Sequence, residues 1–172
     1  MKIRQEQASD YEEVYTLVKT AFDSNPSTDG LVPDYLNDLR TKDTFIPQLS
    51  LVTELENGKI IGQVVLYKTH ITTPDATVTE LVLSPISVHP GYFRQGIARA
   101  MMERAFEIAK NMGYKLVFLC GDPAFYRKIG FTPSFEHNIY HVSDKDKNAE
   151  WCMVRELVVG ALCNVSGTID IE

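Results

Sequence analysis

The clearest chemical signal in the sequence is a glycine-containing turn in front of an expected helix. Residues 94–98 read RQGIA, and Arg99 follows them. The first turn of a helix has backbone N–H groups without an intrahelical partner, and the aligned peptide dipoles place partial positive charge there. Gly96 lets an anion approach the backbone without a Cβ in the way, and Arg94 and Arg99 add full charges. The segment predicts a phosphate site, although an ordinary strand-to-helix turn also uses a glycine for tightness.

Two common phosphate-binding fingerprints are missing from the chain. The sequence contains neither G-x-x-x-x-G-K-[ST] nor G-x-G-x-x-G. The first pattern marks nucleoside triphosphate loops and the second marks dinucleotide-binding folds. An unrelated nucleotide-binding α/β protein therefore has no motif in its favour.

The elements around the turn form a recognisable unit. A long strand is expected over residues 78–88, with Pro85 suggesting a bulge or a place where pairing stops. Apolar residues at helical spacing run from Ile97 to Met112, and Gly113 closes that helix. The unbroken apolar run 116–120 is typical of a buried parallel strand. Strand, turn, helix and strand together predict a right-handed βαβ unit.

The rest of the chain predicts a mixed α/β or α+β fold with helices on both faces of the sheet. Strands are expected at residues 2–5, 48–55, 60–67, 131–135 and 151–158, and Asn57-Gly58 marks a hairpin. Helices are expected at residues 11–22, from Pro33 to Leu39, and at 123–129. No linker or repeat divides the sequence, so residues 1–172 are expected to form a single domain, with the C-terminal strands of 131–172 as part of it.

Composition narrows the possible functions. The chain of 172 residues has a net charge of −6, which argues against a nucleic-acid surface. No apolar run reaches the roughly 18 residues of a membrane span, and the N-terminus lacks a signal-peptide core, so a cytoplasmic location is the default expectation. Cys120, Cys152 and Cys163 are odd in number and far apart in sequence. They predict no disulfide framework and no metal site, and are interpreted as small buried hydrophobic residues.

Residues 88–102 resemble the acetyl-CoA signature of the GNAT superfamily of N-acetyltransferases. The signature V-x-P-x-Y-[QR]-x-x-G-x-[GA] is matched in register by Val88, Pro90, Tyr92, Gly96 and Ala98. Phe93 stands where the family usually has Gln or Arg, and Arg94 follows one position later. The family binds pyrophosphate mostly through backbone amides, so the resemblance still implies a coenzyme A site.

A second segment supports the same resemblance. Residues 126–131 look like the Y-x-x-x-G-F segment of the family, and residues 121–123 and 151–167 look like one uncharacterised bacterial branch of it. The hairpin at 54–62 fits the family's second and third strands. The resemblance spans nearly the whole chain. It implies a GNAT-like mixed, mostly antiparallel central sheet with one parallel βαβ unit.

The resemblance also implies a reaction and a set of binding residues. The expected activity is acetyl-CoA-dependent transfer of an acetyl group to a primary amine of a small molecule, amino acid or peptide, by direct transfer in a ternary complex without a metal. Val88 is the candidate N–H for the oxyanion. The cofactor-binding residues implied are Ile86, Ser87, Val88, Phe93, Arg94, Gln95, Gly96, Ile97, Ala98 and Arg99.

Two side chains are candidates for proton transfer. Tyr126 matches the family's general acid, because a phenol with a pKa near 10 is protonated at neutral pH and can donate to a departing thiolate. Its alternative role is aromatic packing on the sheet. Glu80, on the strand before the signature, is the candidate base, and its alternative is a solvent-facing strand-edge carboxylate. His89 is expected to be a turn residue, and Asp122 a helix cap.

Two segments, 22–35 and 135–146, are expected to form the part of the site where the acceptor amine enters. Asp23, Asp29 and Asp34 in the first segment would attract a cationic amine, but they also suit a solvated loop. A homodimer is a possible assembly. The alternative to an enzyme is a non-catalytic acyl-CoA-binding regulatory module, which would keep the cofactor site without the chemistry.

Overall fold

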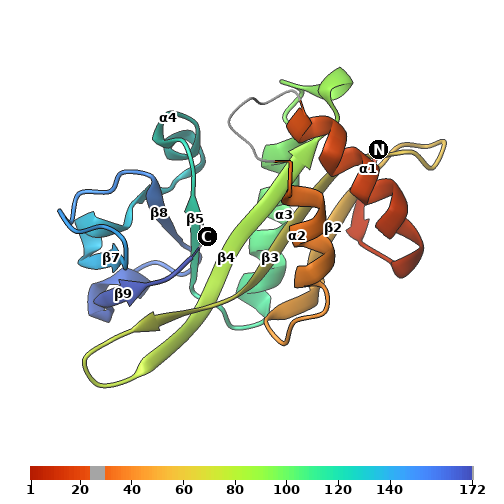
Figure 1. The fold of residues 1–172 in the computed structure, drawn as a ribbon. Coiled ribbons are helices and arrows are strands. Elements are labelled where there is room, and N and C mark those ends of the chain that lie inside the picture. Colours follow the sequence, from red (N-terminus) through yellow and green to blue (C-terminus); the bar gives the residue numbers. More distant parts are fainter. Residues whose placement is uncertain (24–29, 172) are drawn as a thin grey trace. The chain divides into compact units, whose positions relative to one another are not determined.

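The computed structural model describes residues 1–23 and 30–171, and its chain packs as two compact units (Figure 1). The N-terminal unit comprises residues 1–67 and 84–108, and the C-terminal unit comprises residues 68–83 and 109–172. Two long strands, β3 (Ile60–Thr72) and β4 (Thr77–Val88), contribute residues to both units. Each unit is described separately below.

The N-terminal unit contains the antiparallel part of the sheet that begins at the N-terminus. β1 (Lys2–Gln5) pairs with β2 (Phe45–Glu54), and β2 pairs with β3. The β2–β3 connection contains Gly58, whose φ of 86° is left-handed. Asn57 does not share this conformation, so the expected hairpin forms without the two left-handed residues of a type I′ turn. Arg4 on β1 forms ion pairs with Glu54 on β2 and with Asp10, the residue just before the first long helix. These ion pairs fix β1 between its neighbouring strand and that helix.

The helices of this unit cover both faces of its sheet. They are α1 (Tyr11–Asp23), α2 (Val32–Leu39) and α3 (Ile97–Asn111). A Cβ on Gly62 of β3 would touch the Met101 side chain of α3 at 3.0 Å, whereas Tyr67 of β3 shares a hydrogen bond with Tyr35 of α2. Successive side chains of a strand point to opposite faces, so residues 62 and 67 face opposite ways. The expectation of helices on both faces is confirmed.

The C-terminal unit contains the parallel pair. β5 (Leu116–Cys120) runs parallel to β4, with Leu81 opposite Val117 and Val82 opposite Phe118. β8 (Cys152–Glu156) is antiparallel to β5, and β6 (Thr132–Pro133) is antiparallel to β8. Since β4, α3 and β5 follow one another along the chain, they are the expected βαβ unit. The predicted mixed, mostly antiparallel sheet is therefore present.

Three details differ from the expected elements. The strand expected at 131–135 is only Thr132–Pro133, and a 3₁₀ turn follows at Ser134–His137, because a proline has no N–H to continue the ladder. Two short strands that the sequence did not indicate, β7 (Ile139–His141) and β9 (Gly167–Ile169), pair in parallel, and β9 also pairs with β3. Pro85 does not interrupt β4, which continues through a cis Ser84–Pro85 peptide bond. Within the described ranges, no helix is long and apolar enough to cross a membrane.

Candidate functional site

The predicted anion turn lies between β4 and α3 in the N-terminal unit. After β4 ends at Val88, a 3₁₀ turn covers Pro90–Tyr92, and α3 begins at Ile97. The His89 ring accepts a hydrogen bond at Nδ1 from the Gly91 N–H, at 3.1 Å. That contact is the turn role expected for His89, and it holds the chain as it leaves β4.

The backbone conformation of the turn bears on the predicted anion site. Arg94 and Gly96 both have left-handed φ angles, 61° and 78°. A non-glycine residue in this region carries about 1–2 kcal/mol of strain, which surrounding structure must stabilise. The first α-helical hydrogen bond runs from the Ala100 N–H to the Gly96 carbonyl, at 3.0 Å. The amides that precede Ala100 in this first turn have no partner within the helix, so they can bind an anion.

The side chains of the turn divide into exposed and buried groups. Phe93 is 49% exposed, and Arg94, Gln95 and Arg99 are exposed as well. Ile97, by contrast, is buried in the core, so only its backbone is available to a ligand. A Cβ added to Gly96 would meet no atom within 4 Å. The space above Gly96 is therefore open to a ligand.

Two backbone N–H groups near the end of β4 point away from β3. The His89 N–H donates to the Ile61 carbonyl of β3 at 2.8 Å. Because N–H groups alternate in direction along an extended chain, the Val88 N–H points away from β3. That direction fits the proposed oxyanion donor. Ile86 lies two residues before Val88 on β4, so the Ile86 N–H points the same way.

The Ser87 side chain has a structural role. Its hydroxyl donates to Gln63 Oε1 at 3.0 Å, and the Gln63 amide donates to the Pro85 carbonyl at 3.4 Å. Both side chains are buried, so they join β3 and β4 inside the sheet. Gln63 was missed in the sequence, where its only signal is one polar residue in the apolar run 60–67.

Tyr126 ends helix α4 (Pro123–Tyr126) in the C-terminal unit. The Asp122 carboxylate caps this helix by accepting from the Ala124 N–H at 2.9 Å, as expected. A Cβ on Gly121 would lie only 2.4 Å from the Tyr126 ring, so a glycine is needed for the ring to lie against the end of β5. The ring also makes edge contacts with Phe125 and Phe131.

The Tyr126 hydroxyl is available as an acid. It makes no hydrogen bond to any residue in the described ranges. Burial, with a smaller effect of the Asp122 charge, raises its pKa above the ordinary value of 10. A phenol with a raised pKa is fully protonated at neutral pH. The packing and acid roles are therefore compatible in this residue.

Glu80 is buried and held by backbone amides. Its Oε2 accepts from the Lys115 N–H at 2.9 Å and from the Leu116 N–H at 3.0 Å. Desolvation raises the pKa of the carboxyl, and the two amides together with the Lys115 charge oppose that shift. The solvent-facing alternative is wrong for Glu80, because its side chain is only 6% exposed.

The structure does not bring Glu80 and Tyr126 together. Glu80 contacts Leu116, the first residue of β5, whereas the Tyr126 ring contacts Gly121, just past the last one. Five residues of extended chain separate these two points, which is about 16 Å. Glu80 therefore fixes the start of β5 and lies too far from Tyr126 to exchange a proton with a group bound there.

The raised pKa of Glu80 predicts a pH dependence of stability. A carboxyl whose pKa is higher in the folded than in the unfolded protein favours folding at low pH, and this contribution is lost as the pH rises through the folded pKa. Glu80→Gln should not lose stability in this way, because glutamine does not ionise. We therefore expect the melting temperature of the variant minus that of wild type to increase from pH 4 to pH 8. Thermal melts across that range measure the difference. A melting-temperature difference that does not change with pH would contradict the raised pKa of Glu80.

The expected acceptor segments are only partly described. Asp29 lies outside the described residues, and Asp23 is the last residue of α1. Asp34 accepts a hydrogen bond from the Tyr15 hydroxyl at 3.0 Å. In the other segment, Asp144 accepts from the Asn148 and Ala149 amides and so closes a loop. Asp34 and Asp144 thus already have local partners.

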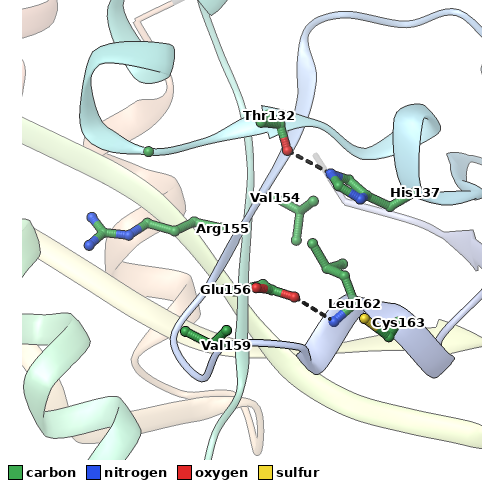
Figure 2. A pocket seen from close by; sticks show the side chains of 9 residues that line it. Thr132, His137, Val154, Arg155, Glu156, Val159, Leu162 and Cys163 are labelled. Atoms are coloured by element: carbon green, nitrogen blue, oxygen red, sulfur yellow. Dashed lines mark hydrogen bonds between the residues drawn. The ribbon is translucent and has the colours of Figure 1, made fainter.

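A pocket of about 520 Å³ lies beside β6 and β8 in the C-terminal unit (Figure 2). Its polar groups bind one another: Thr132 and His137 share a hydrogen bond of 2.7 Å, and Glu156 accepts from the Leu162 amide at 2.8 Å. Figure 2 shows the Arg155 side chain directed away from Glu156. None of the predicted site residues lines this pocket. Within residues 1–23 and 30–171, no group of three or more His, Cys, Asp or Glu side chains is placed to hold a metal ion.

Comparison with known proteins gives one family match and several relatives. The model of the acetyltransferase (GNAT) domain family matches residues 2–134. The uncharacterised N-acetyltransferase YhbS of Escherichia coli is 28% identical over 139 residues, which cover 81% of this chain and 78% of YhbS. The uncharacterised N-acetyltransferase YjhQ of the same species is 29% identical over 126 residues, or 73% of this chain and 65% of YjhQ.

Solved structures show the same fold. The structure of Escherichia coli YhbS in complex with CoA matches with a TM-score of 0.86 at 23% identity, over 99% of this chain and 89% of that one. A GNAT family acetyltransferase from Brucella melitensis in complex with acetyl-CoA matches with a TM-score of 0.78 at 20% identity, over 99% and 95% of the two chains. At these identities the likeness concerns the fold alone.

Proposed function

This chain belongs to the GNAT family of N-acetyltransferases, and we propose that it transfers the acetyl group of acetyl-CoA to a primary amine. The observation that carries the proposal is the turn before α3. It combines left-handed Arg94 and Gly96, open space above Gly96, and helix amides without an intrahelical partner. A pyrophosphate is the part of coenzyme A that such a turn would bind. Relatives of the same fold bind CoA and acetyl-CoA, which supports this assignment.

We assign the cofactor contacts mainly to backbone groups. The amides from Gln95 to Arg99 bind the pyrophosphate, and the exposed Arg94 and Arg99 add positive charge at the same helix end. Phe93, half-exposed beside them, offers an apolar contact in place of the family's usual polar side chain. Along β4, the Ile86 and Val88 amides serve the pantetheine arm and the thioester.

The reaction joins a nitrogen to the acetyl carbon and breaks the carbon–sulfur bond. A neutral amine attacks the thioester carbonyl, whose oxygen becomes negative and is stabilised by the Val88 N–H. When the intermediate collapses, the electron pair of the C–S bond leaves on sulfur. Tyr126 donates its proton to that sulfur and regains one from solvent, and the amine's proton passes to solvent. Transfer is direct within a ternary complex, so no acyl-enzyme is formed.

Glu80 as the general base stays a prediction, and its contacts favour a structural role. A base must reach the proton that it removes, yet the carboxylate is occupied by two amides at the far end of β5 from Tyr126. The reaction requires an acceptor with a primary amine, which would be a small molecule, an amino acid or a peptide. The possible homodimer also stays a prediction.

The decisive experiment follows the release of free coenzyme A thiol. The protein is mixed with acetyl-CoA and a panel of primary amines: small diamines, amino acids and short peptides. We expect thiol release that depends on one amine class, with initial rates of a sequential rather than ping-pong pattern. Tight acetyl-CoA binding without thiol release across the panel would instead support the alternative, a non-catalytic acyl-CoA-binding regulatory module.

A further inference from the structure

Cys120 and Cys152 are neighbours in the structure, although they are distant in sequence. Cys120 is the last residue of β5 and lies directly opposite Cys152, the first residue of β8. Both thiols are reduced, with Cys120 exposed and Cys152 buried. Cys163 is exposed too, so the expectation of three buried cysteines holds only for Cys152. The register of β5 against β8 brings Cys120 and Cys152 together, which their spacing in the sequence does not indicate.

The ladder around this pair has the geometry for a cross-strand disulfide. The Gly121 N–H donates to the Trp151 carbonyl directly opposite it, at 2.9 Å, so these residues form a hydrogen-bonded pair. Such pairs alternate along an antiparallel ladder, so the adjacent Cys120–Cys152 pair is a non-hydrogen-bonded one. Its Cα atoms are expected about 4.5 Å apart, within the range that a disulfide spans. A disulfide at this position is therefore compatible with the pairing of β5 and β8.

The surroundings of Cys152 favour its thiolate. The Ser134 hydroxyl donates a hydrogen bond to the Cys152 sulfur at 3.3 Å, and the Cys120 side chain lies within hydrogen-bonding range of the same sulfur. The Cys120 thiol also donates to the Ile171 carbonyl at 3.9 Å. The interaction with Cys120, then the Ser134 hydrogen bond and the nearby His141 ring, lower the pKa of Cys152, against the opposing effects of burial and Asp144. The interaction with Cys152, together with burial, raises the pKa of Cys120, so Cys120 keeps its proton. Cys120 is therefore the exposed thiol of the pair, and Cys152 is the buried thiol that loses its proton more easily.

We propose that Cys120 and Cys152 form a redox-active pair, which closes reversibly into a cross-strand disulfide by exchange with a low-molecular-weight disulfide such as oxidised glutathione. This proposal does not depend on the acetyl transfer. Cys120 is the entry point because it is the exposed member of the pair, whereas Cys152 is buried. Cys152 then resolves the mixed disulfide that forms.

The exchange balances in two steps. Once Cys152 has lost its proton to solvent, the Cys120 proton passes to the Cys152 thiolate. The Cys120 sulfur then attacks one sulfur of the glutathione disulfide, whose S–S bond breaks and releases one glutathione thiolate. Cys152 gives up its proton to that thiolate and attacks the Cys120 sulfur, so the second glutathione leaves as a thiolate and takes a proton from solvent. The two protein thiols are oxidised, and one glutathione disulfide is reduced to two glutathione thiols.

The test uses the whole protein equilibrated with reduced and oxidised glutathione. Free thiols are counted after denaturation, and disulfides are located by peptide mass mapping. We expect wild type to lose two of its three thiols and two hydrogen atoms in mass. The melting temperature of the oxidised form should rise by about 5–10 °C, because the bond constrains the unfolded chain.

Matched variants separate the steps. Cys163→Ser is the control, because it removes the exposed cysteine outside the pair, and it should lose both remaining thiols. Cys152→Ser lacks the resolving thiol and should accumulate glutathione on Cys120. Wild-type protein that keeps glutathione on Cys120 without forming the internal bond would overturn the proposal. A bond that involves Cys163 would overturn it as well, and both results can be read without any variant.

Discussion

Replacing Gly96 with glutamate is expected to abolish coenzyme A binding and leave the fold intact. The new side chain would extend into space where no protein atom lies within 4 Å of the Cβ, so it meets no steric barrier. A non-glycine residue at φ 78° costs about 1 kcal/mol, and a carboxylate at a helix N-terminus returns about 0.3–1 kcal/mol through the helix dipole. The same carboxylate competes for the amides that bind pyrophosphate and repels its charge. Affinity should fall at least about 100-fold, which is roughly 3 kcal/mol.

Two matched variants separate the possible reasons for that loss. Gly113 has a φ of 96°, is equally open, and follows the other end of the same helix. Gly113→Glu therefore carries the same strain and charge away from the turn, and its affinity should remain within about twofold of wild type. Gly96→Gln keeps the bulk without the charge and should bind with intermediate affinity. Isothermal titration with coenzyme A measures all three, and equal affinity of Gly96→Glu and wild type would remove the turn from the site.

Elements with local signals were predictable from the sequence. The Asn57-Gly58 turn, the apolar spacing of α3 and the apolar run of β5 each depend on residues close together in the chain. The turn before α3 belongs to the same class, since Gly96 and the helix behind it are adjacent, whereas its binding of an anion stays a prediction. Local conformation and burial are encoded within such windows, and therefore these elements appear near the predicted positions.

Features that depend on pairing between distant segments were not predictable. β7 and β9 have three residues each, too few to show a period, and they exist because β9 pairs with the end of β3. The Cys120–Cys152 pair depends on the register of β5 against β8, which no local pattern encodes. Glu80 was a reasonable base on strand alternation alone. Only the structure shows that its carboxylate is bound to the amides that begin β5.

Replacing Tyr126 with phenylalanine is expected to lower turnover without weakening acetyl-CoA binding. Phenylalanine keeps the ring contacts with Phe125 and Phe131 and the close approach to Gly121, so the local packing survives. Only the proton donor is lost, and the departing thiolate must then take its proton from water. Turnover should fall roughly 10- to 1000-fold, with a nearly unchanged KM for acetyl-CoA.

The pH dependence and a second tyrosine make this test specific. Tyr126 acts only when protonated, so its contribution is full below its pKa and is lost as the pH rises through that value, above 10. The alkaline decline in wild-type turnover should therefore be missing from Tyr126→Phe. Tyr114 also has a pKa raised by burial and by Glu80, but it precedes the opposite end of β5, so Tyr114→Phe should keep turnover within about twofold. Stopped-flow assays of thiol release from pH 6 to 10.5 compare the three proteins. If Tyr126→Phe matched wild type at every pH, Tyr126 would be a packing residue, and the departing thiolate would have to be protonated by another group.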